Sequence, residues 1–87
     1  MSLQESDADI LTHVSRRLFA ESREEFSAAH RLGMESFNAP TSAERLTLFG
    51  EALEREGRAF KMRREAIELM RAALDLRAKA WGKLKAT

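Results

Sequence analysis

The sequence predicts an all-α protein, an elongated antiparallel helical hairpin with a long second helix of coiled-coil character. Helix-forming residues dominate the 87-residue chain, which has one proline and four glycines. No segment alternates polar and apolar residues with the period of a strand. Apolar residues instead recur every seven positions through the second half. Eighty-seven residues suffice for one domain, so we expect 1–87 to be a single helical domain.

The first helix is expected over residues 7–32. Ser6 or Asp7 can cap its free amide groups, and an acidic first turn suits the helix dipole. Gly33 is a natural stop, and Asn38 and Pro40 break the pattern, so residues 33–41 are expected to form the turn. Polar residues interrupt the apolar side of this helix at Ser15, Ser22 and Glu25. The apolar positions are Ile10, Leu11, Val14, Leu18, Phe26, Ala29 and Leu32.

The second helix is expected over residues 42–84. Thr41 and Glu44 have the spacing of a capping box, in which Thr41 accepts a hydrogen bond from the Glu44 amide. From there the seven-residue repeat continues without a slip to Leu84, so an unbroken helix would be about 65 Å long. Such a helix is too long for a compact globule of this size.

Three rows of residues follow this repeat along the second helix. Alanine occupies positions 52, 59, 66, 73 and 80, and large apolar residues occupy positions 46, 53, 60, 67, 74 and 81. A third row lies on the other flank of the alanines. Together the rows span an apolar arc of roughly 150°, wider than a two-stranded seam needs. The second helix is therefore expected to pack against two neighbouring helices. The residues of the third row are Leu48, Met62, Leu69 and Leu76.

A break near Gly57 is the alternative fold, because glycine costs about 1 kcal/mol relative to alanine inside a helix. A break there would give a three-helix bundle with elements near 7–32, 42–56 and 58–84. The unbroken repeat across Gly57 favours the long helix, since a turn has no reason to preserve its phase.

An apolar arc wider than one partner helix predicts a surface for protein–protein contact. We expect a non-enzymatic interaction module, either a homo-oligomer or a subunit or adaptor in a larger assembly with a helical partner. Charges within the arc, at Glu56, Arg63 and Arg77, are expected to pair across the contact and set its orientation. The predicted interface residues are Leu53, Ala59, Phe60, Ala66, Ile67, Met70, Ala73, Leu74 and Trp81.

The residue types of a catalytic or metal site are few. The chain has no cysteine and no tyrosine, and it has no glycine-rich phosphate loop. His13 and His30 are too far apart to form an i,i+4 metal pair. We therefore expect no catalytic residues, no metal and no cofactor.

Charge and hydropathy predict a cytoplasmic protein. Fifteen basic residues nearly balance fourteen acidic ones, no apolar run approaches a membrane span, and no signal peptide opens the chain. A basic end with Trp81 among Arg77, Lys79, Lys83 and Lys85 leaves nucleic-acid binding as an alternative. A hairpin with a proline-containing turn is also a shape used by secretion-system subunits and co-chaperones, which gives another alternative.

The segments AAHRLGMESFNAP, residues 28–40, and ALEREGRA resemble the histidine phosphotransfer domains of two-component signalling. That family carries a phosphorylatable histidine in an Ala-His-x-Leu-Lys-Gly setting, whose lysine this chain lacks. The resemblance implies a signalling role in which His30 takes a phosphoryl group from a response-regulator aspartate.

Overall fold

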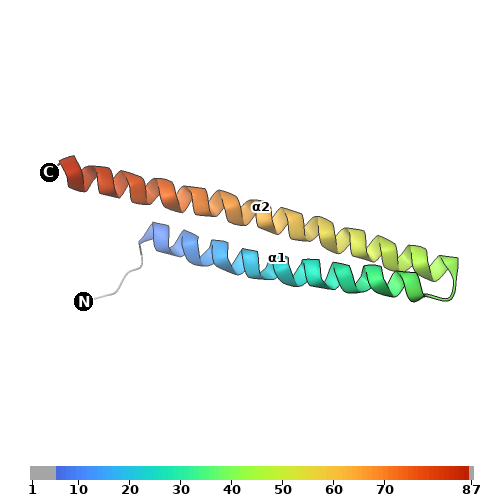
Figure 1. Ribbon diagram of the computed structural model, residues 1–87. Helices are drawn as coiled ribbons and strands as arrows, with labels where there is room; N and C mark the ends of the chain where they lie inside the picture. Colours follow the sequence, from blue (N-terminus) through green and yellow to red (C-terminus); the bar gives the residue numbers. More distant parts are fainter. Residues whose placement is uncertain (1–5, 87) are drawn as a thin grey trace.

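The computed structural model describes residues 6–86, which form two antiparallel helices joined by a short turn (Figure 1). Helix α1 is Asp7–Asn38 and helix α2 is Ser42–Ala86. The molecule measures 70 × 26 × 12 Å, with a radius of gyration of 19.8 Å, whereas a compact domain of this length has about 12 Å. The predicted elongated hairpin is confirmed.

Both helices begin at the caps that the sequence indicates. The Ser6 hydroxyl accepts a hydrogen bond from the Asp9 amide at 3.2 Å, and the Thr41 hydroxyl accepts one from the Glu44 amide at the same distance. The Arg45 guanidinium donates to the Ala39 carbonyl at 3.0 Å across the turn. Each bond satisfies a backbone group that a helix end leaves without an intrahelical partner.

Helix α1 does not stop at Gly33, as the sequence predicts, but continues to Asn38. No described glycine has a positive φ, so Gly33 is an ordinary helical residue. The added turn of helix places Ser36 in the contact with α2, where it is buried. Pro40 ends the helix instead, because the residue before a proline is disfavoured in the helical conformation.

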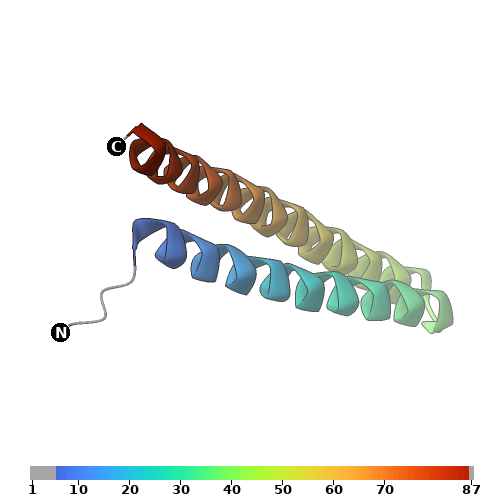
Figure 2. The ribbon, with the colours of Figure 1, turned by 60° about the vertical axis from the view of Figure 1, so that its left-hand side comes forward.

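Helix α2 passes Gly57 without a break, so the three-helix alternative is wrong. The helix also extends slightly beyond the predicted end at Leu84, to Ala86. Figure 1 shows that α2 continues past the start of α1, and Figure 2 shows from another side that α1 runs alongside α2.

The contact between the helices consists of small side chains repeated every seven residues on both helices. The largest side chain that is fully buried is that of Ser15. Small residues allow two helix backbones to approach closely, and the larger neighbours are then displaced to either side. The buried residues of this row are Ala8, Ser15, Ser22, Ala29 and Ser36 on α1 and Ala52, Ala59, Ala66 and Ala73 on α2.

A buried hydrogen bond between the helices fixes their register. The Ser15 hydroxyl, which is 0% exposed, donates to the Ala66 carbonyl at 2.7 Å. One heptad in either direction from that pair brings further small residues opposite one another, Ala8 with Ala73 and Ser22 with Ala59. In this register the core residue at every seventh position is small on both helices.

Ser15→Ala is expected to lower the free energy of unfolding by about 1 kcal/mol, because it removes a buried hydrogen bond between the helices. Ser22→Ala is the matched control, since the Ser22 hydroxyl bonds only to Phe19 within its own helix. Alanine favours helix more than serine does, so Ser22→Ala should leave stability unchanged or raise it. Chemical denaturation measures both. Equal effects of the two changes would contradict this account of the register.

Candidate interaction surface

One broad side of the hairpin, which we call the aromatic face, carries all six aromatic residues of the chain. The Phe26 and Phe60 rings meet across the two helices edge to face, with centroids 5.0 Å apart. Helical periodicity places the other aromatic residues on the same side of the small-residue row as Phe26 and Phe60. The aromatic face consists of Phe19, Phe26 and Phe37 on α1 and Leu46, Phe49, Leu53, Phe60, Ile67, Met70, Leu74, Trp81 and Leu84 on α2.

The opposite side, which we call the aliphatic face, is better covered by the hairpin itself. Most of its large residues are half-buried. The Glu25 carboxylate lies 3.6 Å from Arg55 and 3.7 Å from Arg58, which ties the two helices together on this side. The aliphatic face consists of Leu11, Val14, Leu18 and Leu32 on α1 and Leu48, Met62, Leu69 and Leu76 on α2.

The aromatic face remains largely exposed to solvent. Leu53, Phe60 and Leu74 are 53%, 50% and 56% exposed, although each directly follows a buried alanine of the core. Helix geometry explains this exposure, because a residue directly after a core alanine points about 100° away from the contact, whereas a residue three positions after one, on the aliphatic face, points about 60° away. A row of large apolar residues thus lies open along α2.

The structure divides the predicted interface residues into two groups. Ala59, Ala66 and Ala73 are 0% exposed. They lie in the contact between α1 and α2, so they set the approach of the chain's own helices and are closed to a second chain. Met70 is half-buried, and the exposed members are Leu53, Phe60, Ile67, Leu74 and Trp81.

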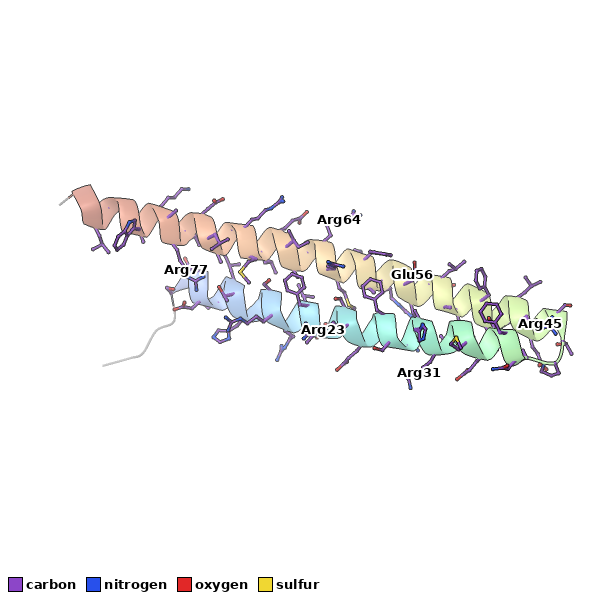
Figure 3. All side chains as sticks on the ribbon, viewed as in Figure 1. Arg23, Arg31, Arg45, Glu56, Arg64 and Arg77 are labelled. Atoms are coloured by element: carbon purple, nitrogen blue, oxygen red, sulfur yellow. The ribbon has the colours of Figure 1, made fainter. Side chains whose placement is uncertain are left out.

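The predicted charged residues also differ in their surroundings. The Arg77 guanidinium donates to the Asp9 carboxylate at 3.0 Å, so this arginine pairs within the chain (Figure 3). Glu56 lines a shallow groove with Phe26 and His30. Arg63 lines another with Phe60 and Ile67. Among the described residues, neither Glu56 nor Arg63 has an ion-pair partner.

The contact between Arg77 and Asp9 lowers the pKa of the Asp9 carboxyl group, first through the Arg77 hydrogen bond and then through Ser6. Because the pKa is lowered on folding, the contact stabilises the hairpin above the ordinary pKa of aspartate. That contribution is lost as the pH falls through the folded pKa. Both side chains are about half exposed, so the contribution is small.

Arg77→Gln is expected to raise the pKa of Asp9 towards its ordinary value, since the largest cause of the shift is removed. A carboxyl-carbon NMR titration measures this pKa. Lys79→Gln, two residues further along the exposed end of α2, is the control and should leave it unchanged. An unaltered Asp9 pKa in Arg77→Gln would contradict the contact.

His30 is exposed on α1, beside the groove that Phe26, Gly33 and Phe37 line. Glu56 is the one other ionisable side chain in that lining, and its carboxylate would repel an incoming phosphoryl group. Gly33 stands at the position of the lysine that phosphotransfer domains carry, and no lysine or arginine is among the described residues that line the groove. The groove therefore gives the phosphotransfer alternative little electrostatic support.

Nothing in the described chain resembles a metal centre or a membrane span. Residues 6–86 contain no group of three or more His, Cys, Asp or Glu side chains placed to hold a metal ion. Neither helix has a stretch, within the part that the structure describes, that is long and apolar enough to cross a membrane.

The fold and surface define a two-helix hairpin with an open apolar face. Comparisons with protein-family models, curated proteins and solved structures find no match for this chain. What can be inferred about function therefore comes from the surface itself.

Sequence reasoning did not find the α1 half of the aromatic face. Phe19 and Phe26 are seven residues apart, and each lies four residues after a buried serine of the core. Alignment of the small residues of α1 with the alanines of α2 places these phenylalanines on the same side of the hairpin as Phe60. The signal was present in the spacing of Ser15 and Ser22.

Proposed function

We propose that this chain is a non-enzymatic helical protein–protein interaction module, a subunit or adaptor whose aromatic face packs against helices of another chain. One observation carries the proposal. The hairpin buries only small side chains between its helices and leaves a continuous row of large apolar side chains exposed, from 38% at Ile67 to 72% at Leu46. Exposed apolar stripes of this length mark interaction surfaces in small soluble proteins.

The energetics of the chain support a partner. The accessible surface is 7016 Å², whereas a compact monomer of 9.9 kDa exposes roughly 5,200 Å². Burying a large apolar side chain completely is worth about 1.5–3 kcal/mol. A partner that covered the aromatic face would bury these side chains further and would be stabilised by the free energy of that burial.

Charges on the same face supply orientation. Glu56 and Arg63 sit between large apolar residues without a partner in the described chain, so a docked helix would desolvate them unless it offered opposite charges. Pairing across the contact then selects one alignment of the partner over others. The absence of cysteine from the sequence is compatible with work in a reducing compartment, and we propose the cytoplasm.

A photoreactive amino acid at position 60 tests this function in the cells that produce the chain. With the photoprobe in place of Phe60, illumination is expected to give discrete covalent adducts. The same probe at Lys61, the next residue along α2 but on its outer edge, should not. Equal adduct yields at the two positions, or none at either, would contradict an interface on the aromatic face.

A further inference from the structure

We infer that the occupant of the aromatic face is a second copy of this chain, packed antiparallel to the first to form a closed four-helix bundle. This inference rests on the proposed function and specifies its partner. The two copies would be related by a two-fold axis across the middle of α2, with α2 against α2 and α1 against α1.

The most exposed apolar residues lie at opposite ends of the aromatic face. Phe37 and Leu46, at the turn, are 79% and 72% exposed. Trp81 and Leu84, at the end of α2 that extends past α1, are 60% and 69% exposed. An antiparallel second copy brings its turn end to the projecting end of the first. The two-fold axis repeats this contact between a turn end and a projecting end, so both exposed ends of each copy are covered.

The large apolar row of α2 is symmetric about its centre in the way a two-fold contact requires. Its members occur every seven residues, three on each side of a point between Phe60 and Ile67. Around that point Phe60 faces Ile67 of the second copy and Leu53 faces Leu74. Leu46 then faces Trp81, so every member of the row has a large apolar partner.

The charge along α2 favours the antiparallel alignment over the parallel one. Near the turn, residues 42–56 carry four acidic and two basic side chains. Towards the other end, residues 71–84 carry four basic side chains and one acidic. Antiparallel copies place the acidic segment of one beside the basic segment of the other, whereas parallel copies place like charges together.

Gly50 and Gly57 lie along the outer flank of the large apolar row, where no contact within the hairpin requires a residue without a side chain. A Cβ atom at either position would meet nothing within 4 Å, and each glycine costs a helix about 1 kcal/mol relative to alanine. A second helix packed along this flank would explain the glycines, because the absence of side chains there lets the backbone of the second helix approach α2 closely. In the antiparallel alignment Gly50 lies close to Ala78 of the second copy.

The area is sufficient for a stable dimer. Each chain exposes about 1,800 Å² more than a compact monomer of its mass. Covering that excess on two copies buries an area within the roughly 2,000–5,000 Å² of obligate homodimers.

Cysteine cross-linking tests the arrangement, since the chain has no cysteine of its own. Gly50→Cys and Ala78→Cys change exposed positions beside the large apolar row. With a short bismaleimide, a mixture of the two variants is expected to form a covalent dimer. Each variant alone should not, because antiparallel copies hold identical residues about 40 Å apart. Arg64→Cys, near the two-fold axis, should cross-link to itself.

Three results would overturn the inference. Self-cross-linking of Gly50→Cys alone would indicate parallel copies. No covalent dimer from any variant, with helical circular dichroism retained, would exclude self-association through this face. Photoadducts at position 60 that contain only a different protein would leave the interaction function intact but contradict a second copy as the partner.

Discussion

Ala66→Leu is expected to disrupt the hairpin and to cost more stability than the loss of the Ser15 hydroxyl. Ala66 is 0% exposed, and its carbonyl accepts the Ser15 hydrogen bond that sets the register. Overpacking a core typically costs about 1–3 kcal/mol and occasionally more, and a domain this small has little stability to lose. Thermal unfolding followed by circular dichroism should show a much lower midpoint or no cooperative transition.

Ala80→Leu is the matched control, because Ala80 continues the alanine row beyond the start of α1 and is exposed. The same enlargement there should leave the unfolding midpoint near that of the parent chain. Similar losses for both variants would mean that the alanine row is not a close contact between α1 and α2.

The double change Leu53→Gln and Leu74→Gln is expected to abolish self-association while keeping the helices. Each leucine is about half exposed, so its burial in the dimer is worth on the order of 1 kcal/mol. A dimer loses four such contacts, which corresponds to roughly a thousandfold weaker association. The unfolding midpoint of the parent should rise with protein concentration, as it does for dimers, and that of the variant should not.

Leu76→Gln provides the control for this pair, since Leu76 lies two residues from Leu74 on the aliphatic face. It should retain the concentration dependence of the parent chain. A double variant whose unfolding midpoint matches that of the parent at both low and high concentration would show that the aromatic face does not contribute to self-association.

Much of the fold could be predicted from particular residues. The caps at Ser6 and Thr41 follow from side-chain chemistry within four residues of sequence. The unbroken alanine row predicted that α2 passes Gly57 as a single helix. These are local or strictly periodic signals, which is why a single sequence sufficed.

The remainder depends on which surfaces meet. Ser15 and Ser22 look like defects in an apolar stripe until α2 is placed opposite, where only small side chains fit. Gly33 looks like a stop until Ser36 is seen to extend the same contact by one heptad. The alanines of α2 looked available to another chain for the same reason, because nothing in the sequence assigns α1 to them.

The mass of the chain in solution tests the central claim most directly. Light scattering coupled to size exclusion, on the full chain across a range of concentrations, should give about twice the 9.9 kDa of one chain. A mass of 9.9 kDa at every concentration, from a folded helical sample, would contradict an aromatic face that is covered by a second copy.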